Sequence, residues 1–481
     1  MKLRDLLKDI PFTYTAVDLD IDIREVRYDS RAVQPGDLFV AVRGFATDGH
    51  AYIGMALKKG AVAVVCEQAG KGIPAVIVPD ARAALADIAG NRFDHPSRKL
   101  TMVGVTGTNG KTTTTTLIKH ILEAEGHKVG LIGTNQNMIG DEVIPTERTT
   151  PESYELQALF ARMAEAGCTH CVMEVSSHSL VLDRVRGVRF AVGAFTNLTQ
   201  DHLDFHKTME AYREAKAKLF TISDKGVINL DDPVADKMLA DAECPCLTFS
   251  ADKDAADLSA KNIELGASGV SFVAATRDAI ARVSLGIPGH FSVENALAAL
   301  GVCVALGVPL EHAARALGTA HGVKGRAEVV PTDTDYTVLI DYAHAPDGVS
   351  NILRTVRGFA KGRVIALFGC GGDRDRTKRP IMGHLAAELS DYCIVTSDNP
   401  RTEQPETIIE DIVAGMKDAK VPVDVICDRR AAIYHALDIA QKDDVIVLMG
   451  KGHETYQEID HVKHHMDERE IVADYFKEKN V

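Results

Sequence analysis

Long apolar runs are missing from this sequence of 481 residues, and none approaches the length that would cross a membrane. Residues 1–9 carry too many charges for a signal peptide. Cysteine is scattered through the chain, and its odd count of nine does not indicate a disulfide framework. Cys168 and Cys171 have the spacing of a redox or zinc pair, but they have no second pair and open a predicted buried strand, which favours inert core thiols. We therefore expect a cytoplasmic protein without membrane insertion.

Basic charge is also in short supply. The chain has 54 lysine and arginine residues against 68 aspartate and glutamate residues, so its formal net charge is −14. This balance argues against non-specific binding to nucleic acid or to an anionic membrane. It leaves room for an anionic small substrate, because such a substrate needs only a local group of basic side chains and helix N-termini. We expect no nucleic-acid partner.

A glycine-rich turn between a strand and a helix is the most informative stretch. Residues 99–105 form a short apolar run typical of a buried strand, and residues 112–126 have helical spacing of apolar side chains. Glycines let backbone amides face an anion, Lys111 can reach the outer phosphates, and Thr112 can hold Mg²⁺. Val105 stands where the usual spacing has a glycine, so the loop is a variant. The residues predicted to bind ATP are Gly107, Thr108, Asn109, Gly110, Lys111, Thr112 and Thr113.

The length of the chain exceeds what one hydrophobic core supports. A polar segment with a proline, residues 93–99, and a glycine-containing segment, residues 322–328, mark two boundaries, so we expect domains at 1–96, 97–324 and 325–481. The first domain mixes short strands and helices. Strands alternate with helices in the other two, which predicts an α/β fold with a mainly parallel central sheet. The predicted strands are 129–132, 171–175, 192–197, 227–230, 337–342, 364–368, 392–396, 423–426 and 445–449.

A second glycine-rich stretch, residues 363–374, offers a different interpretation. It is similar to a dinucleotide-binding fingerprint after a strand, but Arg374 stands where the third glycine should allow close packing of the helix. Arg376, Lys378 and Arg379 follow closely. A loop that binds anionic groups therefore fits this stretch better than a loop for NAD.

Polar side chains follow two predicted strands of the central domain. Glu174, Ser176 and His178 come after one strand, and His202 and His206 come after another. Ligands bind at the carboxyl ends of strands in doubly wound sheets, so carboxylate and imidazole groups near a phosphate loop suggest Mg²⁺ ligands. Taken singly, each histidine fits a surface or core position better than a metal site. A serine hydrolase is a weaker alternative, because no nucleophile elbow surrounds Ser176.

Lys216 lies in a predicted helix, residues 208–220, beside an apolar face formed by Tyr212, Ala215 and Leu219. Two interpretations stay open. In the first, which the spacing alone favours, the aliphatic part covers the apolar face and the ammonium stays in water. In the second, the lysine is partly desolvated, its pKa is lowered, and it reacts as the neutral amine.

Taken together, these features resemble the Mur ligases, a family of ATP-dependent amide ligases, over essentially the full length of the chain. The resemblance rests on many ordered motifs rather than on one loop. One departure is Arg148, where the family pattern has asparagine. The motifs are Asp29-Ser-Arg31, Gly107-Thr-Asn-Gly-Lys-Thr-Thr113, Thr149-Thr-Pro151, Glu174-Val-Ser-Ser-His178, Asp201-His-Leu-Asp-Phe-His206, Ala215-Lys216, Gly325-Arg-Ala-Glu328, Asp341-Tyr-Ala-His-Ala-Pro346, Gly369-Cys-Gly-Gly-Asp-Arg374, Asp398-Asn-Pro-Arg401 and Gly450-Lys-Gly-His-Glu454.

The resemblance implies three domains: a small N-terminal α/β domain for the uridine nucleotide, a central P-loop ATPase domain, and a C-terminal Rossmann-like domain that closes over the site. It also implies which residues contact the UDP-linked substrate. These residues are Ser30, Thr149, Thr150, Ser176 and Arg184.

Two Mg²⁺ ions are implied as well. Thr112 and Glu174 would hold the first, and His202 and a CO₂-derived carbamate on Lys216 would hold the second. Carbamylation would turn a cation that repels Mg²⁺ into an anion that binds it. The residues with implied catalytic roles are Lys111, Glu174, His202 and Lys216. Beyond the loop, the residues expected at ATP are Asn295, Arg326 and the segment 341–346.

The implied activity is the addition of meso-2,6-diaminopimelate to UDP-N-acetylmuramoyl-L-alanyl-D-glutamate, a step in the synthesis of peptidoglycan precursors, carried out by a monomer. The D-glutamate carboxylate would attack ATP to give an acyl phosphate, and the amine of the amino acid would then displace phosphate. Two alternatives remain. One is a related ligase, such as a folylpolyglutamate synthetase or the alanyl-alanine-adding enzyme of the same family. The other is a nucleotide-gated binding protein that forms no amide.

The choice of amino acid is expected to depend on Arg401. Meso-diaminopimelate has one carboxylate more than L-lysine, and a guanidinium can hold that carboxylate with two parallel hydrogen bonds. Leaving Arg401 unpaired against L-lysine would add a penalty, so discrimination on the order of 10⁴-fold is expected. The alternative is that Arg401 only closes a turn after Pro400. The residues expected at the amino acid are Arg374, Asp398, Asn399, Pro400, Arg401, Gly450 and Glu454.

Overall fold

The computed structural model describes residues 1–44, 47–146, 148–320 and 322–479. The chain forms two compact units. The first comprises Met1–Phe249 with Gly301–Val308, and the second comprises Ser250–Leu300 with Pro309–Val481.

The N-terminal part of the first unit is a five-stranded sheet with the order β1-β5-β4-β3-β2. Strand β1 is antiparallel to β5, and the other neighbours are parallel. The strands β3 and β4 are short apolar runs whose side chains are all buried, as expected for a sheet covered on both faces. The elements are α1 (Leu3–Leu6), β1 (Tyr14–Thr15), β2 (Val26–Arg27), β3 (Leu38–Val40), η1 (Gly49–Tyr52), α2 (Ile53–Lys58), β4 (Ala63–Cys66), β5 (Ala75–Ile77), α3 (Ala81–Arg92) and η2 (Pro96–Lys99).

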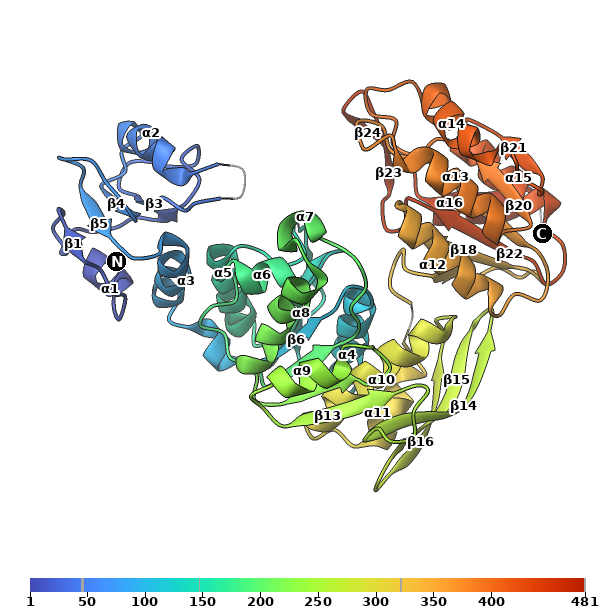
Figure 1. The fold of residues 1–481 in the computed structure, drawn as a ribbon, viewed down its shortest axis with the longest axis horizontal. Helices are drawn as coiled ribbons and strands as arrows, with labels where there is room; N and C mark the ends of the chain where they lie inside the picture. The colour runs from blue at the N-terminus through green and yellow to red at the C-terminus, as the bar shows by residue number, and fades with distance from the viewer. Residues whose placement is uncertain (45–46, 147, 321, 480–481) are drawn as a thin grey trace. The chain divides into compact units, whose positions relative to one another are not determined.

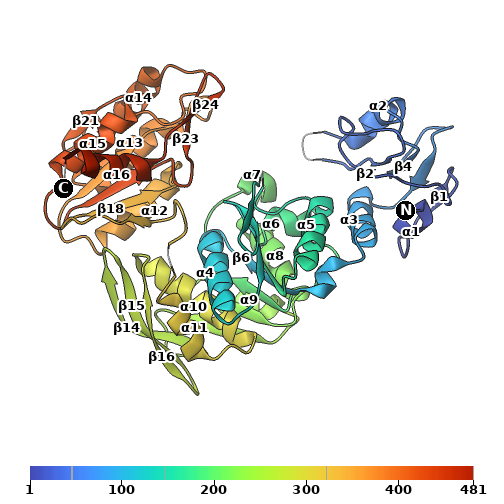
Figure 2. The same ribbon diagram turned by 180° about the vertical axis from the view of Figure 1, so that it is seen from behind.

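The rest of the first unit is built on a mainly parallel sheet with the order β13-β12-β11-β6-β10-β7-β8-β9. Strands β8 and β9 form an antiparallel hairpin at its edge. Helix α4 packs against β6, β7 and β10, and α4 and β6 lie side by side in Figure 2. The elements are β6 (Thr101–Thr106), α4 (Lys111–Ala124), β7 (Val129–Ile132), β8 (Asn137–Ile139), β9 (Glu142–Ile144), α5 (Ser153–Glu165), β10 (His170–Glu174), α6 (Ser177–Val181), β11 (Val192–Phe195), α7 (Leu203–His206), α8 (Met209–Ala217), η3 (Lys218–Thr221), β12 (Gly226–Asn229), α9 (Ala235–Asp241) and β13 (Cys246–Ser250).

The second unit begins with an antiparallel meander of three strands, in which buried and exposed side chains alternate along β16. A six-stranded sheet follows, with the order β17-β18-β22-β19-β20-β21, antiparallel only between β17 and β18. The elements are β14 (Leu258–Gly266), β15 (Gly269–Thr276), β16 (Ile280–Leu285), α10 (His290–Ala305), α11 (Leu310–Leu317), β17 (Glu328–Val330), β18 (Thr337–Asp341), α12 (Pro346–Arg357), β19 (Val364–Phe368), α13 (Lys378–Leu389), β20 (Tyr392–Val395), α14 (Pro405–Val413), η4 (Ala414–Met416), β21 (Val423–Val425), α15 (Arg429–Ile439), β22 (Val445–Met449), β23 (Tyr456–Ile459), β24 (Val462–His465) and α16 (Glu468–Lys479).

The predicted α/β fold class is confirmed, and each predicted strand coincides with an observed one to within two residues at either end. Three antiparallel elements were not predicted. They are the meander β14–β16 and the hairpin β23–β24, both labelled in Figure 1, and the hairpin β8–β9. The predicted core thiols Cys168 and Cys171 are buried and unpaired. Among the described residues, no helix is both long enough and apolar enough to cross a membrane.

Candidate active site

The phosphate loop lies between β6 and α4, as the sequence predicts. Gly107 and Gly110 have positive φ angles of 152° and 83°, which L side chains rarely adopt. A Cβ atom on Gly107 would lie 1.9 Å from Thr196 Oγ1, so only glycine fits there. Thr196 Oγ1 donates to Asn109 O (2.6 Å), and Asn109 N donates to Asn197 Oδ1 (2.9 Å). The end of β11 therefore holds the loop in shape.

Lys111, the first residue of α4, extends back across this loop. Its Nζ donates to Gly107 O (2.9 Å) and Thr108 O (2.8 Å). The ammonium and the N-terminus of α4 therefore place positive charge at one point of the loop. Thr112 and Thr113 follow in the first turn of the helix, where Thr112 is partly exposed and Thr113 is buried.

Lys216 is buried, with 1% of its surface exposed. The interpretation that keeps its ammonium in water is therefore wrong. Its Nζ donates to Gly107 O (2.8 Å) and lies 4.4 Å from the centroid of the Tyr212 ring. Burial, together with the nearby Lys111 ammonium, holds the pKa of the Lys216 amine well below its usual value. The structure thus joins the desolvated Lys216 to the phosphate loop through the Gly107 carbonyl, which also accepts a hydrogen bond from Lys111.

Glu174 ends β10 and is buried, at 1% exposure. Its two carboxylate oxygens accept hydrogen bonds from the backbone N and the Oγ1 of Thr134 (both 2.9 Å). Thr134 Oγ1 also lies 3.0 Å from Thr149 Oγ1. This carboxylate is held in a fixed orientation at the carboxyl edge of the sheet, next to the strand that leads into the phosphate loop.

Three histidines gather beside this edge. The His178 ring lies 4.8 Å from the His202 ring and 5.5 Å from the His206 ring, measured between centroids. His206 is buried and bonded to Ser177 Oγ (2.9 Å), and burial with the neighbouring His178 lowers its pKa to about 4. His202 is exposed, at 47% of its side chain. No group of three or more histidine, cysteine and acidic side chains suited to a metal occurs in the part of the chain that the structure describes.

Most of the residues predicted at the UDP-linked substrate lie together. Thr150 Oγ1 donates to Glu174 O (2.8 Å) and accepts from Ser176 N (3.2 Å), and Arg184 Nη1 donates to Thr150 O (3.0 Å). Ser176 caps α6 by accepting from Ser179 N. Ser30 lies in the N-terminal part, where its hydroxyl contacts Met55 Sδ (3.6 Å). Within the described part of the chain, no hydrogen bond joins Ser30 to this group.

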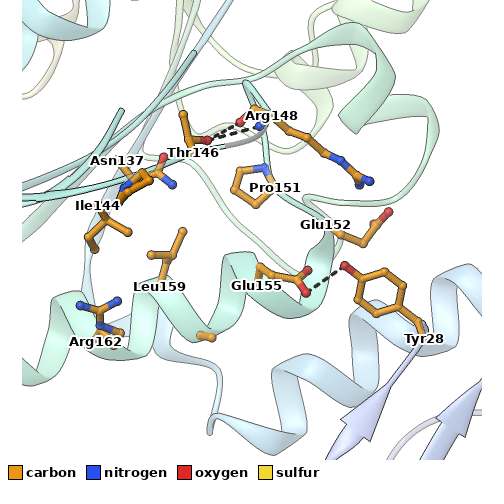
Figure 3. A pocket seen from close by; sticks show the side chains of 12 residues that line it. Tyr28, Asn137, Ile144, Thr146, Arg148, Pro151, Glu152, Glu155, Leu159 and Arg162 are labelled. Carbon is orange, nitrogen blue, oxygen red and sulfur yellow. Dashed lines mark hydrogen bonds between the residues drawn. The ribbon is translucent and has the colours of Figure 1, made fainter. Parts of the chain in front are cut away.

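A cavity of about 450 Å³ adjoins the loop that carries Thr149 and Thr150 (Figure 3). Its wall is largely apolar and carries charge of both signs, positive from Arg148 and Arg162 and negative from Glu152 and Glu155. Tyr28 OH donates to Glu155 Oε1 (2.8 Å) at one side, which ties the N-terminal part to α5. The lining residues are Tyr28, Asn137, Ile144, Pro145, Thr146, Arg148, Pro151, Glu152, Glu155, Ala158, Leu159 and Arg162.

In the second unit, the strand ends of β20 and β22 bring together most residues predicted at the amino acid. Asn399 Nδ2 donates to Glu454 Oε2 (2.9 Å), and the fully buried Lys451 donates to both Asn399 Oδ1 and Glu454 Oε2 (2.7 Å each). A Cβ atom on Gly450, whose φ is 112°, would lie 2.4 Å from Asp398 Oδ2. Because of this close approach, only glycine fits at position 450.

Arg401 follows Pro400 with a φ of 51°. Its Nη1 donates to Gly372 O (2.8 Å) and its Nε donates to Glu458 Oε2 (3.2 Å). Arg401 is therefore not unpaired, which corrects the premise of the expected penalty against L-lysine. Arg374, by contrast, is exposed on the glycine-rich loop, where Nη1 donates to Asp373 O (3.0 Å).

The two residues predicted at ATP outside the loop also belong to the second unit. Asn295 is buried in α10. The Arg326 guanidinium lies 5.3 Å from the centroid of the Tyr342 ring, and its Nε is buried with no hydrogen-bond partner in the described chain. Asp341 accepts from the backbone N of Ala327 and of Ala343 (2.8 Å each), which fixes the segment that follows β18.

Sequence reasoning missed several residues that hold the site together. Thr134, Thr196 and Asn197 each follow a strand of the parallel sheet, so their position at its carboxyl edge was a usable signal. Lys451 follows β22 in the same way. Glu458 had no such signal, because its side chain contacts Arg401, a residue far earlier in the chain.

Comparison with known proteins agrees with this geometry. Three family models match the chain: "Mur ligase family, catalytic domain" at residues 22–93, "Mur ligase middle domain" at 105–303, and "Mur ligase, glutamate ligase domain" at 325–452. Among curated proteins, the UDP-N-acetylmuramoyl-L-alanyl-D-glutamate–2,6-diaminopimelate ligase of Caldanaerobacter subterraneus subsp. tengcongensis is 50% identical, over 99% of each chain. A protein from Clostridium acetobutylicum named as ligase 1 of the same kind is 47% identical, over 99% of this chain and 100% of that protein.

Solved structures show the same relationship. A structure named as a UDP-N-acetylmuramoyl-L-alanyl-D-glutamate–2,6-diaminopimelate ligase has a TM-score of 0.75 and 32% identity, covering 100% of this chain and 99% of that one. MurF ligase from Thermotoga maritima, solved in complex with ADP, has a TM-score of 0.63 at 21% identity over 96% of this chain and 100% of that one, a likeness of fold alone. From this full-length similarity it follows that the chain belongs to the Mur ligase family.

Proposed function

We propose that this protein is an ATP-dependent amide ligase that joins meso-2,6-diaminopimelate to UDP-N-acetylmuramoyl-L-alanyl-D-glutamate and releases ADP and phosphate. The observation that supports this most strongly is the buried Lys216, bonded to the Gly107 carbonyl of a phosphate loop. It occurs in a chain similar along its whole length to proteins named for this reaction. The domains proposed for it are residues 1–96, 97–324 and 325–481, acting within a monomer.

The reaction proceeds in two steps. A carboxylate oxygen of the D-glutamate residue attacks the γ-phosphorus of ATP, the bond to the β-phosphate oxygen breaks, and an acyl phosphate and ADP result. The amine nitrogen of diaminopimelate then attacks the acyl carbon and loses a proton, and the carbon–oxygen bond to phosphate breaks. Lys111 and the loop amides hold the phosphates in position and balance their charge, and positioning and charge balance supply most of the catalysis in phosphoryl transfer.

Two cation sites are part of the proposal. The first uses the Thr112 hydroxyl and the oriented Glu174 carboxylate, an oxygen donor set that suits Mg²⁺. The second uses the exposed His202 imidazole and Lys216. Bound Mg²⁺ supplies positive charge to the phosphate oxygens.

Lys216 as an amine does not fit a cation site, but its burial favours the form that can be modified. The low pKa makes the neutral amine available, its nitrogen attacks the carbon of CO₂, and a proton leaves to water. The product is a carbamate, which is an anion. The ammonium of Lys111 nearby favours that negative charge.

The UDP-linked substrate is assigned to Ser30, Thr149, Thr150, Ser176 and Arg184. The bonds that join Thr150, Ser176 and Arg184 support a shared role for these three. The adjoining cavity offers space beside them, and Arg148 in its wall offers a guanidinium to an anionic group (Figure 3). Asn295 and Arg326 are assigned to ATP, and the orphaned Nε of Arg326 supports contact with an anionic ligand.

The amino acid is assigned to the cluster at the ends of β20 and β22. Arg374, Arg401 and Asn399 offer donors to carboxylates, while Asp398 and Glu454 offer acceptors to amines. The contact of Asn399 with Glu454 supports the joint role of the segments that carry them. The residues of this cluster are Arg374, Asp398, Asn399, Pro400, Arg401, Gly450 and Glu454.

Release of ADP by the full-length protein tests the proposal. With ATP and Mg²⁺, turnover should require both the UDP-linked dipeptide and diaminopimelate, and omission of either should stop it. Turnover with D-alanyl-D-alanine or with folate and glutamate would assign the protein to a related ligase. ATP binding without any amide product would assign it to a nucleotide-gated binding role. Either of these results would contradict the proposal.

A further inference from the structure

The hairpin β23–β24 is tied to the segment 398–401 by backbone and side-chain hydrogen bonds. The bonds are Gln457 Nε2 to Asp398 O (2.7 Å), Glu458 N to Asn399 Oδ1 (2.9 Å), Arg401 N to Glu458 O (3.0 Å) and Asp460 N to Arg401 O (2.8 Å). The hairpin therefore fixes the backbone of Arg401 in its left-handed conformation. A residue of this hairpin is in a position to influence which amino acid the segment accepts.

Glu458 is that residue, because its side chain meets the Arg401 guanidinium. Glu458 Oε2 accepts from Arg401 Nε at 3.2 Å, and the two side chains are 20% and 17% exposed. Gly372 O takes Nη1. Arg401 Nη2 donates no hydrogen bond within the described part of the chain. The outer edge of the guanidinium, formed by Nη1 and Nη2, can therefore receive a ligand carboxylate.

We infer that Glu458 is a specificity-determining residue, whose carboxylate balances the charge of Arg401 and thereby weakens the hold of the site on the second carboxylate of the amino acid. The inference rests on the proposed function, in which Arg401 receives that carboxylate. Two carboxylates on one guanidinium repel each other, and in a half-buried site this repulsion is only partly screened. Diaminopimelate therefore binds less tightly than an unpaired Arg401 would bind it.

The same contact changes how L-lysine is excluded. L-lysine has no carboxylate at its far end, so it meets a guanidinium that already has an anionic partner in Glu458. The penalty for an unpaired charge is then small, and discrimination depends mainly on the bonds that diaminopimelate gains. Glu458 also adds negative charge near the far end of the side chain, where L-lysine carries only its ammonium. Both effects lower the preference for diaminopimelate.

Two other charged side chains nearby make contacts of their own and do not compete for the pair between Glu458 and Arg401. Lys463 stands opposite Glu458 in the hairpin register, but its Nζ lies over the Tyr456 ring at 4.1 Å from the centroid. Asp373, on the glycine-rich loop, accepts from the backbone N and the hydroxyl of Thr402 instead.

The test replaces Glu458 with glutamine, because Glu458→Gln keeps an oxygen to accept from Arg401 Nε and removes only the charge. In the full-length enzyme, the KM for diaminopimelate should fall about 3- to 10-fold. The KM for L-lysine should not fall, and the kcat and the KM for ATP should stay near the wild-type values. The ratio of kcat/KM for the two amino acids should therefore rise.

Glu470→Gln is the matched control. It also removes one negative charge, from a side chain that is bonded to His465 of the same hairpin and has no contact with Arg401. It should leave every constant unchanged. An unchanged or raised KM for diaminopimelate in Glu458→Gln would overturn the inference and leave Glu458 with a structural role. Failure of the proposed function looks different: the wild type would show no diaminopimelate-dependent ADP release, or Arg401→Ala would leave the KM for diaminopimelate unchanged.

Discussion

Replacing Lys216 with methionine should abolish amide formation without weakening the fold. The substitution removes one hydrogen bond, from Nζ to Gly107 O, which contributes about 1 kcal/mol. It also removes a buried amine whose charged form is disfavoured by desolvation, and the flexible methionine side chain fills a similar space. These effects oppose each other, so the melting temperature should stay within about 4 °C of the wild type or rise.

The pH dependence of the free energy of unfolding gives a second test, whose direction follows from the lowered pKa of Lys216. The pKa of Lys216 is lowered in the folded state, so between that value and the ordinary lysine value the unfolded chain binds more protons than the folded one. In CO₂-free buffer, Lys216 therefore makes the free energy of unfolding of the wild type rise with pH across this window. Lys216→Met lacks this contribution, so its stability advantage should be largest at low pH and shrink as the pH rises.

Catalysis should respond far more strongly than stability. If the Lys216 carbamate is a ligand of Mg²⁺, its loss should lower kcat by at least about 100-fold, since even indirect partners of metal ligands cost 10- to 100-fold. ATP affinity, measured by equilibrium binding, should change little, because the phosphate loop keeps its own contacts. Carbon-13 NMR with labelled bicarbonate should show a carbamate signal in the wild type only. In Lys216→Ala, the vacated space should let short carboxylic acids restore part of the turnover.

Lys218→Met is the matched control, since Lys218 lies two residues further on and is exposed. It should keep wild-type turnover and the carbamate signal. Wild-type turnover in Lys216→Met, or the absence of a carbamate at Lys216 in active enzyme, would refute the reasoning. A large fall in melting temperature would show instead that the amine has a structural role.

Three further substitutions test other parts of the site. Arg401→Ala should raise the KM for diaminopimelate by at least about 100-fold, since two charge-assisted hydrogen bonds of about 1.5–3 kcal/mol each are lost; steady-state ADP release measures this, and a parallel rise in the KM for ATP would contradict it. Gly107→Ala should weaken equilibrium binding of ATP at least about tenfold, because its Cβ meets Thr196 Oγ1 at 1.9 Å on a strained backbone; unchanged affinity would show that the loop does not hold the phosphates. Glu174→Gln keeps a hydrogen-bonding oxygen for Thr134 but loses the charge, so half-maximal activity should need about tenfold more Mg²⁺ while the melting temperature stays unchanged. An unchanged Mg²⁺ requirement would show that Glu174 is not part of the cation site.

The parts of the fold set by local sequence could be predicted. Short apolar runs of four to six residues identify the parallel strands, because such strands are buried on both faces. The phosphate loop was predicted for the same local reason: Gly107, Gly110 and Lys111 fall between one such run and a helix. The alternating pattern of β14–β16 was also present in the sequence, but three successive antiparallel strands break the expected order of strand and helix.

The parts of the site set by distant contacts could not be predicted. Whether Lys216 keeps its ammonium in water or buries it depends on Tyr212 and on the Gly107 carbonyl, 109 residues earlier in the chain. Likewise, the sequence alone does not indicate a partner for the Arg401 guanidinium, because Glu458 lies far along the chain and meets it only in the folded structure. The domain boundaries and the assignment of site residues to ligands remain predictions, because burial and hydrogen bonds do not name a substrate.

Oxygen transfer from substrate to phosphate tests the central claim most directly. The UDP-linked dipeptide would be prepared with oxygen-18 in the carboxylate of D-glutamate that accepts the amine, and the reaction run with unlabelled ATP and diaminopimelate. If an acyl phosphate forms, one carboxylate oxygen stays with the phosphorus when the amine displaces it. Mass spectrometry should then find one labelled oxygen in each released phosphate and a tripeptide product that has lost one. Amide formation with unlabelled phosphate would contradict the account.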